Sequence, residues 1–136
     1  MPNTLWRYFL ASIKGTKNVK ARLEKFRKSM ILQAGRALVE EAQLEQKESM
    51  KRTPVLTGAL RASHETSDFT LTKDTIEVSI KVGGASAPYA VVVHEDLSAF
   101  HKVGQAKFLE STIQESAPHM AARVSKRLHL NKAACK

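Results

Sequence analysis

The sequence is poor in cysteine and in aromatic residues, and both shortages limit what the protein can be. Cys135 is the single cysteine of 136 residues, so the chain forms no internal disulfide, and we expect assembly in a reducing cytoplasm. Aromatic residues make up only 6% of the chain. Neither zinc-finger spacing nor the aromatic strand motif of single-stranded RNA binders occurs. These absences exclude a disulfide-stapled domain and the common sequence-reading RNA modules.

The sequence also lacks a long apolar run. The apolar stretch at residues 8–13 is interrupted by Lys14, which leaves it too short for a signal sequence or a membrane span. A membrane-surface helix is an alternative for this segment, because Trp6 has basic neighbours. We expect a soluble, unprocessed chain with no membrane partner.

Catalytic signatures are missing as well. No serine lies in a Gly-x-Ser-x-Gly elbow, and the glycine pair at residues 83–84 lacks the lysine of a phosphate loop. Cys135 lies in a polar tail that holds no base beside it. His94, Glu95, Asp96 and His101 could share a metal only if the chain bends, because His94 and Glu95 on a strand would point to opposite faces. We therefore predict no enzyme, no cofactor and no metal site.

The strongest pattern present is a long helix at residues 17–51. This segment has no proline and one glycine, and its apolar residues recur at spacings of three and four. We place Glu41 and Glu45 on its outer, solvent-facing side. The apolar stripe consists of Val19, Leu23, Phe26, Met30, Ala34, Ala37, Leu38 and Ala42.

The middle of the chain changes to strand-like alternation. Residues 69–72 and 75–82 predict a hairpin with its turn at residues 73–74, because apolar and polar residues alternate on both sides of it. The valine-rich segment 89–95 predicts a third, more fully buried strand.

Residues 105–130 return to helical spacing, with Pro118 expected to kink or divide this helix. The element order predicts an α+β fold: a long N-terminal helix and a kinked C-terminal helix packed on a small antiparallel sheet of three to four strands. The expected organisation is an N-terminal arm at 1–16, a single domain at 17–130 and a flexible tail at 131–136.

The charge is unevenly distributed along the chain. Lys and Arg number 22 against 13 Asp and Glu, and residues 1–36 hold nine cations and one anion. Basic ends around a slightly acidic middle favour a polyanion or an acidic partner surface. A solvated helix face is the alternative. The cations expected to face DNA or a partner are Lys17, Lys20, Arg22, Lys25, Arg27 and Lys28.

Three segments form a set in order and spacing: KRTPVLTGALRAS at 51–63, APYAVVVHE at 87–95 and GQAKFLE at 104–110. The first resembles the TPVxTGxLRxS loop of the tailed-bacteriophage head–tail joining family, also called tail completion or minor capsid proteins. The second resembles the family's YAxxVE strand, and the third the opening of its last helix, where Ala106 replaces the usual proline. The resemblance covers about residues 17–130.

The resemblance implies a structural virion protein of the phage neck, of the tail terminator or tail completion type. Such a protein forms a homo-oligomeric ring, a hexamer or dodecamer, that joins the portal or connector to the tail tube and lets genomic DNA pass. It would assemble in the host bacterial cytoplasm and reside in the virion. The alternative is a small basic DNA-binding protein without sequence specificity.

Within this interpretation a set of residues is expected to shape the subunit or its contacts. We expect Tyr89 to bury its ring, and Phe108 and Leu109 to anchor the last helix on the sheet. The arm and the loop at 96–104 are expected to dock on neighbouring subunits. The full set is Trp6, Phe9, Thr53, Pro54, Thr57, Gly58, Leu60, Arg61, Tyr89, His94, Glu95, Phe108 and Leu109.

Overall fold

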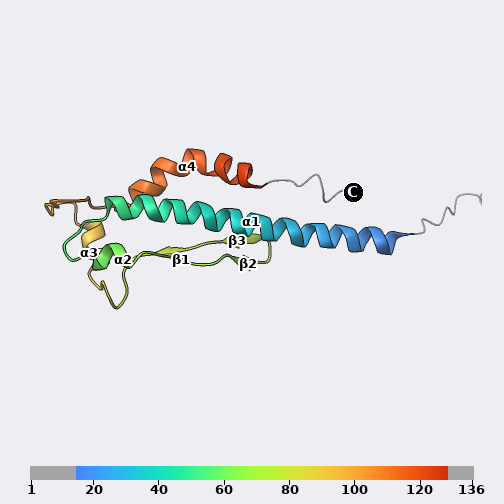
Figure 1. The fold of residues 1–136 in the computed structure, drawn as a ribbon, viewed down its shortest axis with the longest axis horizontal. Helices are drawn as coiled ribbons and strands as arrows, with labels where there is room; N and C mark the ends of the chain where they lie inside the picture. Colours follow the sequence, from blue (N-terminus) through green and yellow to red (C-terminus); the bar gives the residue numbers. More distant parts are fainter. Residues whose placement is uncertain (1–14, 129–136) are drawn as a thin grey trace, which may run out of the picture.

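The computed structural model describes residues 15–128, and it confirms the α+β class. A long central helix has a second helix along one side and a narrow β-ribbon along the other (Figure 1). Trp6 and Phe9 lie outside the described residues. The elements are α1 (Thr16–Arg52), α2 (Ala59–Ala62), β1 (Glu65–Thr66), β2 (Thr70–Thr72), β3 (Thr75–Glu77), β4 (Ile80–Lys81), α3 (Ala90–Glu95) and α4 (Phe108–Arg127).

Helix α1 confirms the strongest prediction from the sequence. Its 37 residues span about 55 Å at 1.5 Å per residue. The helix begins after Gly15, which adopts a left-handed conformation with φ 109°. It ends at Arg52, because Pro54 disfavours the helical conformation at Thr53, which is extended. None of the described helices is long and apolar enough to cross a membrane.

The β-ribbon confirms the predicted hairpin but divides it into two short ladders. Strands β2 and β3 pair in antiparallel fashion around the turn at residues 73–74, and β1 pairs with β4 further along. Between the ladders, the Ser67 N–H donates to the Ser79 carbonyl at 2.8 Å, and the Ser79 N–H donates to the Ser67 hydroxyl at 2.9 Å. A side-chain oxygen thus replaces a backbone carbonyl there, so the expected continuous strand at 75–82 is interrupted.

The predicted third strand at residues 89–95 is wrong, because this segment forms helix α3. Ala90 is buried against the core, while Val91 and Val92 are exposed on the other side of the helix. The chain enters the helix through two turns. The Ala87 N–H donates to the Gly84 carbonyl, and the Ala90 N–H donates to the Ala87 carbonyl, each at 3.1 Å. Tertiary packing of the small alanines therefore overrides the strand propensity of the valines.

Helix α4 runs along α1 and continues through Pro118, so the predicted division near that residue is wrong. Pro118 lies at an exposed position, where its ring meets solvent. The axis of α4 changes direction along its length in Figure 1, as expected for a helix that loses one backbone donor. Helix α1 makes most of the helix contacts with the ribbon, and α4 packs along α1 and lines a common hollow with the ribbon.

The buried core is small and lies at the C-terminal end of α1. Phe108 packs there with Leu60, Ala87 and Ala90, and Val82, Val93 and Leu109 are partly buried around them. Phe108 and Leu109 therefore anchor α4 mainly on α2 and α3, and only Val82 represents the ribbon side. This corrects the expectation that they anchor the last helix on the sheet.

Gly35 lets the ribbon approach α1 closely. A Cβ atom at this position would lie 2.5 Å from the Phe69 ring. We expect Gly35→Ala to lower the free energy of unfolding by about 1–3 kcal/mol, since the ring has to move. In a Phe69→Ala background the same change should raise the free energy of unfolding by about 1 kcal/mol, because alanine favours the helix more than glycine does. Urea unfolding of the four proteins measures this, and an equal effect in both backgrounds would contradict the contact.

Candidate assembly interface

The loop that follows α1 is held by a buried polar cluster. Thr53 and Ser49 have no exposed surface, and His64 is also buried. The Thr53 hydroxyl donates to the Ser49 carbonyl at 2.8 Å, and the His64 Nε2 atom lies 3.1 Å from the Ser49 hydroxyl. Thr53 of the first motif is thus buried inside the subunit.

The hydrogen bonds of this cluster fix the tautomer of His64. Its Nδ1 atom faces the carbonyl oxygens of Leu60 and Arg61 at 3.3 and 3.1 Å, and carbonyl oxygens only accept. Nδ1 therefore carries the proton, and Nε2 accepts from the Ser49 hydroxyl. The pair resembles a nucleophile and its base, but Ser49 is fully buried and reaches no substrate in this arrangement.

Burial of His64 predicts a pH-dependent stability. Burial lowers the pKa of His64 below its usual value, although its backbone hydrogen bonds oppose this. The unfolded chain then binds a proton more readily than the folded one. The contribution of His64 to the free energy of unfolding is therefore complete above about pH 6.5, the ordinary pKa of histidine. It is lost as the pH falls from there through the lower pKa of His64 in the folded protein.

Urea midpoints at pH 7.5 and 5.5 test this expectation. We expect a lower midpoint at pH 5.5 for the wild type and a reduced difference for His64→Gln. His119→Gln is the matched control, because His119 is exposed on α4. If the urea midpoints of His64→Gln at the two pH values differ as much as those of the wild type, another group is responsible for the pH dependence.

The remainder of the first motif shapes the loop and leaves its tip exposed. Gly58 has a φ of 84° and accepts the Ala62 N–H at 2.9 Å, which starts α2. Arg61 donates to the Thr53 carbonyl at 3.2 Å and so ties the two ends of the loop together. Leu60 points into the core. Thr57 is exposed, Pro54 is partly buried, and the neighbouring Leu56 is 97% exposed.

The second motif contributes Ala87 and Ala90 to the core and other side chains to the surface. The His94 ring stands edge-on to the Phe108 ring, with centroids 4.9 Å apart. Glu95 is exposed and pairs with Lys107, whose hydrogen bond is the largest cause of a lowered Glu95 pKa. Tyr89 is exposed, so its ring is not buried as expected. Within residues 15–128, no three His, Cys, Asp or Glu side chains form a group suited to a metal ion.

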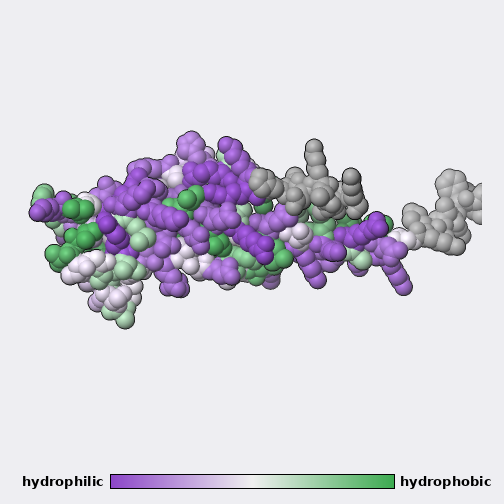
Figure 2. Space-filling model, in the orientation of Figure 1, coloured by the Kyte–Doolittle hydropathy of each residue, from purple (hydrophilic) through white to green (hydrophobic). Residues whose placement is uncertain are grey.

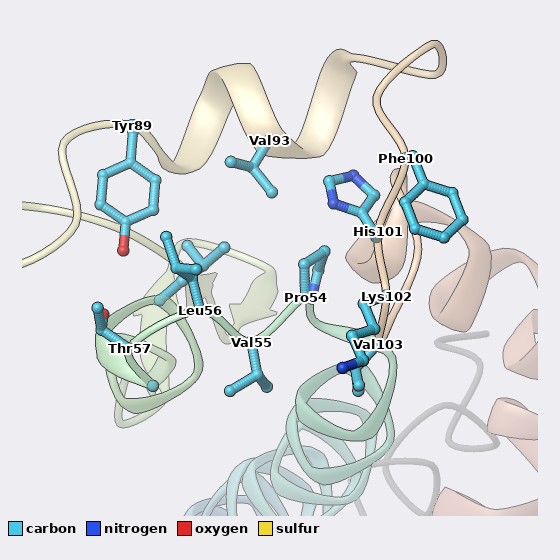
Figure 3. A pocket seen from close by; sticks show the side chains of 12 residues that line it. Pro54, Val55, Leu56, Thr57, Tyr89, Val93, Phe100, His101, Lys102 and Val103 are labelled. Atoms are coloured by element: carbon cyan, nitrogen blue, oxygen red, sulfur yellow. The ribbon is translucent and has the colours of Figure 1, made fainter.

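Loop residues and α3 surround an apolar pocket of about 500 Å³ (Figure 3). Val55 and Leu56 line one side, Tyr89 and Val93 the α3 side, and Phe100, which is 92% exposed, the far side. Apolar surface gathers at this end of the molecule, away from the N-terminal end of α1 (Figure 2). The loop 96–104, which is expected to dock on a neighbour, thus exposes apolar side chains here, and its docking stays a prediction.

The opposite end of the molecule is the protruding first part of α1. Every residue from 16 to 29 is exposed, and this segment extends past the ribbon and α4 (Figure 1). Val19, Leu23 and Phe26 are 58%, 63% and 47% exposed, although they belong to the apolar stripe. All six cations expected to face DNA or a partner lie on the same segment: Lys17, Lys20, Arg22, Lys25, Arg27 and Lys28.

Buried charges join α1 to α4. Glu41 and Glu45 are buried, which corrects their predicted place on the outer face of the helix. Arg123 donates to Glu41 at 2.7 Å and to Glu45 at 2.8 Å, and Arg127 also binds Glu41. Burial raises the pKa of Glu41, but the hydrogen bonds and charges of the two arginines outweigh this and hold the pKa below its usual value.

A second apolar hollow, of about 760 Å³, lies between α1, α4 and the ribbon. We call it the α1–α4–ribbon groove. Its floor is formed by Leu38 and Ala42 of α1, and both flanking elements add aliphatic side chains. The flanking apolar residues are Ile76, Val78, Ile80, Ile113, Met120, Ala121, Val124 and Leu128.

Known protein families, curated proteins and solved structures give no match to this chain. The exposed surfaces therefore have to be interpreted from their own chemistry. The described residues bring together two kinds of unfilled apolar surface: the stripe on the protruding end of α1, and concave surfaces elsewhere on the subunit. The sequence pattern revealed the stripe and its cations. It did not reveal the groove or the buried glutamates.

One signal in the sequence points to the buried side of α1. Ala37, Glu41, Glu45, Ser49 and Thr53 follow each other at intervals of four, which places them on one line along the helix. The line starts within the apolar stripe and continues through polar residues. Such a continuation favours a polar contact with another element over a solvated face.

Proposed function

We propose that the protein is a structural subunit of the neck of a tailed bacteriophage, of the tail terminator or tail completion type. Its copies would form a ring that joins the head, through the portal or connector, to the tail. The observation that carries this proposal is the protruding end of α1. Four turns of helix there combine an exposed apolar stripe with six cations, and they extend past the ribbon and α4 as residues 15–128 are arranged.

Such a segment is expected to need a partner. An isolated helix of about 15 residues is marginal in water, because helix stability in proteins comes mainly from packing of the apolar face. Contiguous exposed apolar surface of this kind is typical of interaction sites. Among the described residues only Ala37, Leu60, Ala87, Ala90 and Phe108 are buried hydrophobics, so further burial on assembly would supplement a small core.

Ring closure requires two different complementary surfaces on each subunit, because head-to-tail contacts repeat around the ring. The subunit offers a basic apolar helix end together with concave apolar surfaces on other elements. The ring is expected to hold six or twelve copies, as the resemblance implies.

A second candidate function is supported by the exposure of the cations. Six exposed cations on one protruding helix suit phosphate contacts that ignore sequence. In the neck these contacts would touch genomic DNA in the lumen. If the protein is instead a small DNA-binding protein, these phosphate contacts would be its function.

Light scattering after size-exclusion chromatography tests the proposal, with the chain alone and with tail tubes of the same virus. We expect the wild type to form a closed oligomer alone or on the tubes, and Leu23→Asp to remain monomeric and unbound. The matched variant carries Lys25→Gln and Lys28→Gln, which leave the stripe intact, and it should still assemble. A wild type that stays monomeric and never joins the tubes would refute the proposal.

Measuring the binding of duplex DNA at about 50 mM and 200 mM salt distinguishes the DNA-binding function from the neck function. Binding by a protein that never assembles would favour the DNA-binding function. This duplex binding should weaken steeply as the salt concentration rises, and it should disappear in the Lys25→Gln, Lys28→Gln variant.

A further inference from the structure

The α1–α4–ribbon groove has the form of a site for a helix. It is about 760 Å³ in volume, and aliphatic side chains line it from three elements. Hydrophobic grooves of this kind bind amphipathic helices through apolar residues at spacings of three, four and seven. No described element of the chain fills the groove. As residues 15–128 are arranged, the groove therefore offers an apolar surface to which a helix can bind.

The stripe on the protruding end of α1 has the spacing that such a groove accepts. Val19, Leu23, Phe26 and Met30 follow at intervals of four, three and four, so they form one line along the helix. The first three are exposed and Met30 is partly buried. The stripe thus supplies an apolar face of about three turns, ready to pack against another surface.

An α1 end that lies in the groove has to belong to a second copy of the chain. Leu23 and the groove residue Leu38 lie on the same continuous helix, about 22 Å apart at 1.5 Å per residue. A subunit cannot place its own helix end in its own groove without breaking α1. A neighbouring copy meets no such restriction.

Charge favours the same pairing. Residues 16–30 carry six cations and one anion, a net charge of +5. The ribbon at 65–81 carries four anions and two cations, a net charge of −2, and its exposed Glu77 lines the groove. The pocket at the other end of the molecule is lined by Lys102, which disfavours a cationic helix. The charge of the ribbon wall thus complements that of the helix end, which favours docking of the helix end on this side of the groove.

We propose that residues 19–30 of α1 from one copy lie in the α1–α4–ribbon groove of the next copy. The inference rests on the proposed function, because it assumes that copies of the chain assemble. It goes further by naming the two surfaces in contact. The helix end and the groove are different surfaces of each subunit, so the contact is head-to-tail and repeats until a ring closes.

Thiol cross-linking between two variants of the full chain tests the contact. Both variants carry Cys135→Ser, so that the introduced cysteines are the only thiols. One variant carries Leu23→Cys, and the other carries Val78→Cys, Ile113→Cys or Met120→Cys in the groove. A short bismaleimide should join the Leu23→Cys chain to at least one groove variant in an equal mixture. The matched control is Val91→Cys, which is exposed on α3 away from the groove and should give no mixed dimer.

A second variant closes the groove without removing buried packing. Ala121 is exposed and lines the groove, so Ala121→Trp should fold normally and fill the space. We expect it to weaken self-association at least tenfold, with circular dichroism and unfolding unchanged.

The outcomes separate the contact from the proposed function. Assembly without any groove cross-link, or cross-links mainly between two Leu23→Cys chains, would overturn the groove contact and leave ring formation standing. Assembly that survives Ala121→Trp would overturn it as well. A chain that neither cross-links nor assembles, even with tail tubes, would overturn both.

Discussion

Replacing Phe108 with alanine is expected to lower the free energy of unfolding by about 3–5 kcal/mol. Phe108 is 1% exposed and is the largest fully buried side chain of the described residues. Its ring contacts the rings of His64 and His94, with centroid distances of 5.7 and 4.9 Å. Truncation would leave a cavity at the point where α2, α3 and α4 meet. Because the core is small, few other contacts compensate for this loss.

Phe100→Ala is the matched control for this prediction. Phe100 is almost fully exposed, so its truncation should change the stability of the monomer by no more than about 0.5 kcal/mol. Urea unfolding monitored by circular dichroism measures both variants. Equal losses for the two phenylalanines would contradict the position of the core at Phe108.

Replacing Gly104 with alanine is the second change expected to have a large effect. Gly104 has a φ of 89°, and a Cβ atom there would lie 2.5 Å from the Pro54 nitrogen and 2.7 Å from the Arg52 carbonyl oxygen. Both neighbours are backbone atoms and cannot move like a side chain. The next residue, Gln105, donates its N–H to the Arg52 carbonyl at 2.9 Å, so the clash would also disturb the end of α1. We expect a loss of about 2–4 kcal/mol.

Gly84→Ala separates backbone strain from the clash. Gly84 also has a positive φ, of 97°, but no atom lies within 4 Å of its Cβ position. Its replacement should cost only the strain of the left-handed conformation, about 1–2 kcal/mol. Thermal unfolding of the two variants gives the comparison. A Gly104→Ala protein as stable as Gly84→Ala would show that the loop at 96–107 does not pack on the end of α1.

The sequence predicts the elements whose patterns are local. The long helix follows from the absence of proline and the regular apolar stripe, and the hairpin follows from alternation on both sides of residues 73–74. For helix α3 the sequence predicts a strand, because three consecutive valines favour β-structure. Its helical form depends on Ala87 and Ala90 packing on Phe108, which is a contact between distant parts of the chain.

The buried charges and the groove depend on distant contacts in the same way. Glu41 is buried because Arg123 and Arg127, more than 80 residues later, lie beside it. No local pattern pairs these residues. The protruding end of α1 is likewise visible only in three dimensions, because the sequence shows the stripe without showing that the other described elements leave it exposed.

The most direct test of the central claim is an electron cryo-microscopy image of tail tubes incubated with the full chain. The claim is that this protein is a structural subunit whose copies assemble through the protruding end of α1. It predicts a closed ring of six or twelve copies at the end of the tube, in which the first turns of α1 pack against the neighbouring subunit. Bare tube ends, or a ring in which those turns project freely into solvent, would contradict it.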